Sequence, residues 1–134
     1  MTNENSLLIT DQDYERLSLL VHHHESETSA LLDEELGRAT IVPQRDIPRD
    51  VVTMNSVVRF EDESSGKENE ITLVYPKDAD VTKGKVSVLA PVGMALIGLR
   101  LGQRIDWPVP NGKFKRLKVI SIAYQPEAHG DWDL

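Results

Sequence analysis

The chain has 134 residues, a formal net charge of −7 and no cysteine. This length favours one globular domain with, at most, a small appendage, and the lack of cysteine excludes disulfides, thiolate nucleophiles and cysteine-based zinc sites. No stretch approaches about 18 consecutive apolar residues, and the N-terminus lacks the basic and apolar segments of a signal peptide. We therefore expect a soluble cytoplasmic protein that does not associate with membranes.

The negative charge is confined to the first part of the chain. Residues 1–50 hold eleven acidic side chains and four arginines, a net charge of −7, whereas the remaining residues are balanced. An acidic segment repels the phosphates of nucleic acids, so we expect no direct binding of nucleic acid. The acidic part suits a basic protein surface or a channel that contains cations. A basic run near the end of the chain has no aromatic platforms beside it and is expected to be a solvated strand face; it holds Lys113, Lys115, Arg116 and Lys118.

Two short helices are predicted in the acidic part. Residues 1–9 are expected to form a frayed leader, and Thr10 then caps a helix that ends at three consecutive histidines. A polar break with two candidate caps, Ser26 and Thr28, precedes a second helix at about residues 29–40. Because the break is so short, the helices should pair as an antiparallel hairpin with arms on the order of 20 Å long. The histidines point about 100° apart on a helix, so they cannot converge on one metal ion.

The hydrophobic pattern changes to period two after a linker with two prolines at residues 41–50, and this change predicts strands. We expect a small, mostly antiparallel sheet. A change of parity in the last strand, from Val119 to Ile120, predicts a β-bulge there, and the tail from residue 126 onward is expected to be ordered only in part. The expected strands lie at residues 52–60, 71–75, 86–89, 103–107 and 114–125.

Residues 87–103 join the third strand to the fourth through a short helix. Pro91 suits the first turn of a helix, where its missing N–H needs no partner, and apolar residues follow it at helical spacing, which predicts a buried face. The expected fold class is therefore α+β. Residues 1–45 form a short helical hairpin, and residues 46–134 form a sheet domain with one short helix.

Few side chains in the sequence suggest a catalytic or metal-binding role. Glu25 and Glu27, near the hairpin tip, could hold Mg²⁺ together with a partner's ligands, or they only cap and solubilise the second helix. No nucleophile elbow, phosphate-binding loop or dinucleotide fingerprint is present, so we expect no catalytic residue, no metal site and no cofactor. The aromatic residues of the sheet could line a pocket for an apolar peptide or simply form core; they are Phe60, Tyr75, Trp107 and Phe114.

Four motifs follow one another in the sheet domain. They are Ser-Val-Leu-Ala-Pro-Val-Gly-Met-Ala-Leu-Ile-Gly at residues 87–98, Gly-Gln-Arg-Ile-Asp at 102–106, Pro-Asn-Gly-Lys-Phe at 110–114 and Val-Ile-Ser-Ile-Ala-Tyr at 119–124. In this order they resemble the C-terminal domain of the Gre-type transcription elongation factors. The resemblance covers most of residues 50–125, and its specificity comes from the shared order of several separate motifs.

The resemblance implies an FKBP-like fold for the sheet domain and a short antiparallel coiled coil for the hairpin before it. It also implies a partner, bacterial RNA polymerase, bound at the rim of the secondary channel. The family's contact turn corresponds here to Ala90, Pro91 and Val92. Ala90 stands where Gre factors commonly have Ser, so a hydroxyl is lost while an apolar contact centred on the proline is kept.

The arm is the main departure from the family. Gre factors carry a long coiled coil whose acidic tip helps the polymerase to hold Mg²⁺ and cleave its own transcript, and an arm on the order of 20 Å is too short for that reach. We therefore expect a monomeric regulator that competes with other channel-binding factors without stimulating cleavage, whether or not Glu25 and Glu27 touch the polymerase. The alternative is an FKBP-like peptidyl-prolyl isomerase or peptide-binding module, although a fold alone does not confer activity.

Overall fold

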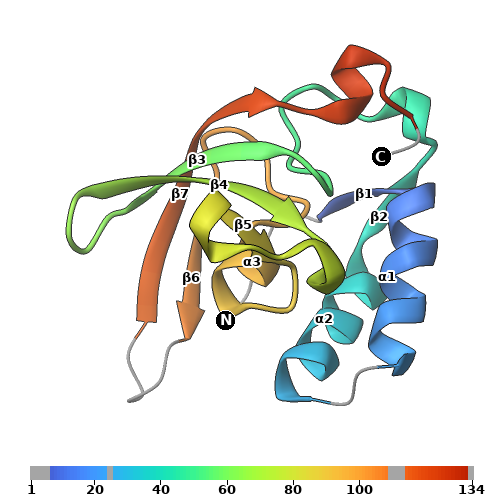
Figure 1. The fold of residues 1–134 in the computed structure, drawn as a ribbon, viewed down its shortest axis with the longest axis horizontal. Coiled ribbons are helices and arrows are strands. Elements are labelled where there is room, and N and C mark those ends of the chain that lie inside the picture. Colours follow the sequence, from blue (N-terminus) through green and yellow to red (C-terminus); the bar gives the residue numbers. More distant parts are fainter. Residues whose placement is uncertain (1–6, 24–25, 109–113, 133–134) are drawn as a thin grey trace.

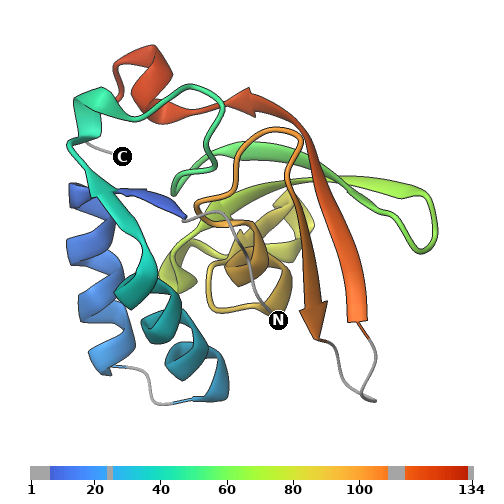
Figure 2. The same cartoon turned by 180° about the vertical axis from the view of Figure 1, so that it is seen from behind.

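The computed structural model describes residues 7–23, 26–108 and 114–132, without the side chains of residues 27, 28, 107, 108, 114 and 115. A curled sheet lies beside a pair of helices, and the C-terminal segment returns to these helices (Figures 1 and 2). Helices and sheet together confirm the α+β class. Among the described residues, no helix is long and apolar enough to cross a membrane.

The elements follow the predicted chain order, with one additional pair of short strands. The helices are α1 (Asp11–His23), α2 (Glu27–Arg38) and α3 (Pro91–Leu96). The strands are β1 (Leu8–Thr10), β2 (Thr40–Val42), β3 (Val57–Asp62), β4 (Lys67–Val74), β5 (Lys85–Ser87), β6 (Arg104–Pro108) and β7 (Phe114–Tyr124).

Helices α1 and α2 form the predicted helical hairpin. As predicted, Thr10 caps α1, because its Oγ1 accepts a hydrogen bond from the Asp13 N–H at 3.0 Å. Of the two candidate caps for α2, Ser26 is the one used: its Oγ accepts from the Ser29 N–H at 3.0 Å. The Ser29 hydroxyl in turn donates to the carbonyl of Val21 at 3.3 Å, which ties the two helices together.

Strands β1 and β2 correct the expectations for residues 1–9 and 41–50. The two strands pair in parallel, with Ile9 opposite Ile41, and the side chains of Leu7 and Ile9 are buried. The described end of the expected leader is therefore part of the core. A three-residue strand is too short to show a period, and its partner lies beyond both helices in the sequence, so no local signal marked the pair.

Strands β3 to β7 form the predicted sheet in the order β5-β4-β3-β7-β6. All neighbours are antiparallel except β4 and β5, which run parallel. The predicted bulge is confirmed, because Val119 and Ser121 pair with consecutive residues of β3 and skip Ile120. This extra residue accounts for the change of parity in the last strand.

The first strand of the sheet is shorter than predicted. The residues before it form a largely buried turn, in which Asn55 has a positive φ of 67° and the Thr53 N–H donates to Ser56 Oγ at 3.1 Å. The alternation of apolar residues there predicted a strand. Side chains such as Met54 are instead buried by packing of the turn, so the alternation reflects burial without strand pairing.

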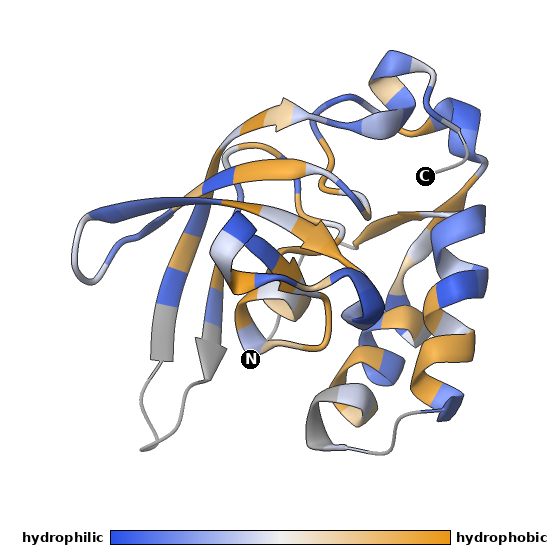
Figure 3. Cartoon of the chain, viewed as in Figure 1, coloured by the Kyte–Doolittle hydropathy of each residue, from blue (hydrophilic) through white to orange (hydrophobic). Residues whose placement is uncertain are grey.

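One hydrophobic core runs through the hairpin and the sheet, where apolar residues of both parts gather (Figure 3). Leu17 of α1 and Leu32 and Leu36 of α2 belong to the same buried cluster as residues of β3 and α3. The hairpin therefore packs along the sheet domain and does not stand away from it (Figure 1). The division into residues 1–45 and 46–134 stays a prediction.

The described part of the C-terminal tail, up to Trp132, is held by contacts with distant segments. Residues Pro126–His129 form a helical turn, and the carbonyl of Trp132 accepts a hydrogen bond from Gln44 Nε2 at 2.9 Å. Gln125 Nε2 donates to the carbonyl of Pro48 at 2.7 Å. These contacts are polar and join segments that are far apart in sequence, so hydrophobic periodicity gave no sign of them.

Candidate functional site

A tight turn joins β5 to α3 and carries the predicted binding residues. Ser87 organises this turn: its carbonyl accepts a hydrogen bond from the Ala90 N–H at 3.0 Å, and its Oγ accepts one from the Leu89 N–H at 3.0 Å. Ala90 is the N-cap residue, with extended φ and ψ of −71° and 147°, and Pro91 begins the helix as predicted. The local sequence thus fixes the backbone of the turn.

Gly93 lets α3 pack its backbone directly against the end of β5. A Cβ at this position would lie 2.2 Å from the carbonyl oxygen of Ser87 and 3.1 Å from Cδ1 of Leu73. No larger residue fits without a shift of the backbone. The side chains of Leu96 and Leu99 are fully buried beyond the turn and complete its anchor in the core.

The three predicted binding residues lie where this anchored segment meets solvent. Pro91 is exposed, and Ala90 and Val92 are half-buried. They present small apolar groups and no acid, base or nucleophile. Such a surface suits contact with a partner and not catalysis, but a role of these residues in binding stays a prediction.

The acidic tip lies largely outside the described residues. Glu25 is not described, and Glu27 is described only as the first backbone position of α2. His22 and His23, two of the three consecutive histidines, are exposed at the end of α1. Within the described parts of the chain, no group of three or more His, Cys, Asp or Glu side chains could hold a metal ion.

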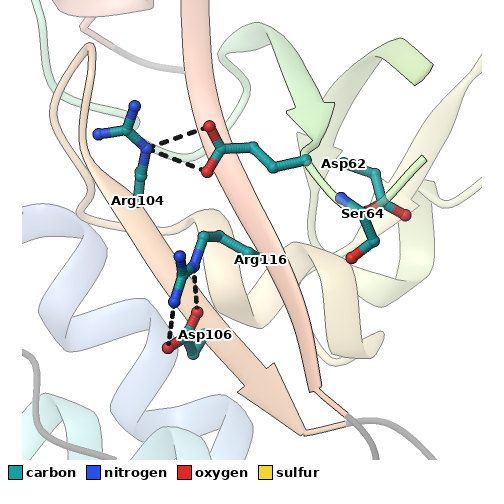
Figure 4. Close-up of polar contacts among 6 residues, drawn as sticks. Asp62, Ser64, Arg104, Asp106 and Arg116 are labelled. Carbon is teal, nitrogen blue, oxygen red and sulfur yellow. Dashed lines mark hydrogen bonds and ion pairs between the residues drawn. The ribbon is translucent and has the colours of Figure 1, made fainter. Parts of the chain in front are cut away.

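A second surface feature is an open polar depression between β6, β7 and the turn after β3 (Figure 4). The charged side chains in this depression neutralise one another. Arg104 Nε donates hydrogen bonds to the two carboxylate oxygens of Glu63 at 3.0 and 3.1 Å. Arg116 Nε donates a hydrogen bond to Asp106 Oδ1 at 2.8 Å. The hydrogen bond from Arg116 lowers the pKa of Asp106. Arg116 belongs to the predicted basic run, and its charge is matched by an acid on the neighbouring strand.

The aromatic residues of the sheet are only partly described. Phe60 is 5% exposed and belongs to the core, and Tyr75 packs against that core. These two residues favour the core interpretation over an open peptide pocket. The side chains of Trp107 and Phe114, and those of Lys113 and Lys115 in the basic run, lie outside the described residues.

Sequence reasoning missed one candidate, the buried carboxyl of Asp13. Its Oδ2 accepts a hydrogen bond from the Met54 N–H at 3.1 Å, 41 residues further along the chain. Burial, with the nearby charge of Glu127, raises the pKa of Asp13 to about 6 against the opposing effect of the Met54 hydrogen bond. No local sequence pattern marks an acid whose partner is so distant.

Comparisons with known proteins match both parts of this architecture. Residues 47–124 match the family model described as "Transcription elongation factor, GreA/GreB, C-term", and residues 5–42 match the one described as "Rnk N-terminus". The two matches define the class of protein, an elongation-factor C-terminal domain behind a short helical N-terminal part. The chain therefore belongs to the GreA/GreB family of transcription elongation factors, in the form that carries an Rnk N-terminus.

Individual relatives agree with this assignment. The chain is 41% identical over 130 residues to the Regulator of nucleoside diphosphate kinase of Escherichia coli strain K12, which covers 95% of this chain and 96% of that protein. A solved structure of a prokaryotic transcription elongation factor GreA/GreB from Nitrosomonas europaea is 45% identical, with a TM-score of 0.74 over 90% of this chain and 100% of that chain. Transcription elongation factor GreA of Thermodesulfovibrio yellowstonii is 35% identical over 94 residues, which are 70% of this chain and 59% of that protein. These relatives give no support to the prolyl isomerase alternative.

Proposed function

We propose that the chain regulates transcription by binding bacterial RNA polymerase at the rim of the secondary channel, where it competes with other channel-binding factors. The observation that carries this proposal is the match of the GreA/GreB C-terminal model to residues 47–124, a region that includes the exposed turn. In this proposal the sheet domain is an FKBP-like platform, the hairpin is a short antiparallel coiled coil, and the protein acts as a cytoplasmic monomer. It regulates the polymerase and catalyses no reaction of its own.

The proposed contact is the apolar turn formed by Ala90, Pro91 and Val92. Pro91 is exposed at the start of α3, on a backbone that is held by the hydrogen bonds of Ser87 and by close packing at Gly93. A partner that binds a preformed turn orders few additional groups, so little conformational entropy is lost on binding. A charge at the centre of such a contact would be buried without a partner, at a high cost in free energy.

The proposed role of the hairpin is to occupy the channel without promoting cleavage. α1 and α2 have 13 and 12 residues, so the arm is on the order of 20 Å long. Part of that length is used for packing, since Leu17 and Leu32 are buried in the shared core. The acidic character of the hairpin suits a cation-rich channel, and Glu25 and Glu27 would lie nearest its far end.

Affinity for purified polymerase tests the proposed contact. Pro91→Asp should weaken binding by at least about tenfold, because it places a charge in an apolar contact. Val81→Asp is the matched control: it adds the same charge at an apolar residue that is 91% exposed, and it should bind as the wild-type chain does. Wild-type affinity of a folded Pro91→Asp variant would contradict the contact.

A transcript-cleavage assay on backtracked elongation complexes tests the proposed effect on the polymerase. The chain alone should not stimulate cleavage, and it should suppress the stimulation caused by a Gre factor as its concentration rises. Robust cleavage with the chain alone would overturn the proposed role of the short arm. A failure to suppress Gre-stimulated cleavage at concentrations that saturate the polymerase would overturn the proposed competition.

A further inference from the structure

Helix α1 and the C-terminal tail meet at a buried polar junction. Asp13, in the first turn of α1, is 4% exposed, and Glu127, in the C-terminal tail, is 9% exposed. Asp13 Oδ2 accepts from the Met54 N–H at 3.1 Å, and Glu127 Oε1 accepts from the Thr53 hydroxyl at 2.7 Å. Two adjacent residues of one turn therefore hold carboxyl groups from α1 and from the C-terminal tail.

Beyond this junction the tail runs back to the segment that follows the hairpin. The carbonyl of Trp132 accepts a hydrogen bond from Gln44 Nε2 at 2.9 Å, and the guanidinium of Arg45 lies 5.8 Å from the centre of the Trp132 ring. His129 is exposed and stacks on Tyr124 with 4.9 Å between the ring centres. The tail thus forms a strap, and the junction is its buried end.

Charged and titratable groups from several elements face the Asp13 carboxyl. Burial and the charge of Glu127 raise the pKa of Asp13 to about 6, while the Met54 hydrogen bond and the cation of Arg16 on α1 oppose this rise. Tyr75, after the end of β4, faces the same carboxyl. Its hydroxyl is buried without a hydrogen bond of ordinary geometry to any described residue, and burial raises the pKa of Tyr75.

We propose that Asp13 and Glu127 form a proton-controlled latch that sets how firmly the hairpin and the C-terminal tail are held on the sheet domain. When Asp13 carries a proton, the two carboxyl groups no longer repel each other and Oδ2 still accepts from Met54. When both groups are charged, their repulsion and the cost of a buried charge weaken the hold. The inference concerns the isolated chain and does not rest on the proposed function.

The direction in which folding stability changes with pH follows from the number of protons that the folded and unfolded states bind. The folded chain keeps a proton on Asp13 up to about pH 6, whereas the unfolded chain releases it near the ordinary pKa of an aspartate, 3.8. The folded state therefore binds more protons in this window, so the stability that the group contributes rises as the pH falls from about 7 toward 4. The exposed acid Asp106 has a lowered pKa and acts in the opposite direction, at more acidic pH.

The NMR signal of the Met54 amide tests the latch in the wild-type chain. Its chemical shift should titrate with a midpoint near pH 6. Glu127→Gln should move this midpoint to lower pH, since it removes the neighbouring charge, and Asp13→Asn should abolish the transition. Asp33→Asn, the same change at an exposed position of α2, and His129→Gln should both leave it in place. A Met54 signal that does not titrate, or that titrates unchanged in Asp13→Asn or Glu127→Gln, would overturn the latch.

Fluorescence of Trp132 tests whether protonation of Asp13 attaches the C-terminal tail more firmly. The chain has two tryptophans, so Trp107→Phe leaves Trp132 as the single reporter. Quenching by acrylamide should be weaker at about pH 5.5 than at about pH 7.5, and adding Asp13→Asn should remove this difference. Adding Asp33→Asn should preserve it. Equal quenching at both pH values while Asp13 is present would contradict the proposed tightening.

Discussion

The turn at residues 90–92 and the junction of Asp13 with Glu127 are held in different ways. The turn rests on close backbone packing at Gly93 and on fully buried apolar side chains. The junction rests on buried polar contacts between three segments that are far apart in the chain. Apolar packing does not respond to protons, whereas buried carboxyl groups do. The difference separates the fixed surface that we propose for a partner from the adjustable attachment that we propose for the hairpin.

The largest expected loss of stability concerns the turn, the fixed region of the two. Gly93→Ala should cost about 3 kcal/mol of unfolding free energy, because the added Cβ meets the backbone carbonyl of Ser87 at 2.2 Å. Urea unfolding measures this loss. The matched control is Gly37→Ala in α2, where a Cβ meets nothing within 4 Å; it should be neutral or stabilising by up to about 1 kcal/mol. A loss below about 1 kcal/mol for Gly93→Ala would show that α3 can shift and that the turn is not rigid.

The next largest loss of stability concerns the junction of Asp13 with Glu127. Thr53→Val should cost about 2 kcal/mol, because Glu127 Oε1 stays buried and loses the donor that now lies 2.7 Å away. Thermal unfolding near neutral pH measures it. Thr40→Val makes the same change at an exposed position of β2 and should alter stability by less than about 0.5 kcal/mol. Similar losses for the two variants would mean that the Thr53 contact does not stabilise the junction.

A smaller effect is confined to the hairpin. Ser26→Ala should cost about 1 kcal/mol by removing the cap of α2, and hydrogen exchange should show the loss in α2 amides more than in β3 amides. Thr28→Ala, at the other candidate cap in the sequence, should cost less. A larger loss for Thr28→Ala than for Ser26→Ala would contradict the assignment of Ser26 as the cap of α2.

The smallest effect concerns the surface ion pairs of Figure 4. Arg104→Ala should cost no more than about 0.5 kcal/mol, because the Arg104 side chain is 54% exposed and water competes for its charge. A double-mutant cycle with Glu63→Ala measures the coupling of the pair. A coupling energy above about 1 kcal/mol would contradict this expectation and show that the ion pair contributes substantially to stability.

Much of the fold could be predicted where the signal is local. The caps at Thr10 and Ser26, the helix start at Pro91 and the bulge at Ile120 all depend on a few neighbouring residues. The position of the candidate binding turn came from the motif order at residues 87–98. The close backbone approach at Gly93 could not be predicted, because the clash that requires a glycine there involves the carbonyl of a different element.

The parts that could not be predicted depend on contacts between distant segments. The parallel pairing of Ile9 with Ile41 joins strands too short to show a period. The buried turn near Met54 has the apolar alternation of a strand without its pairing. The burial of Asp13 and the order of the tail come from polar contacts, which hydrophobic patterns do not record. These are the same contacts that form the junction, so the proposed latch was invisible in the sequence.

Site-specific photocrosslinking to RNA polymerase is the most direct test of the central claim, that residues 90–92 contact the rim of the secondary channel. A photoreactive amino acid in place of Pro91 should crosslink to polymerase segments at the channel entrance. The same group in place of the exposed Val81 should crosslink weakly or not at all. Crosslinks from position 91 to a polymerase surface away from the channel, or equal crosslinking from both positions, would contradict the claim.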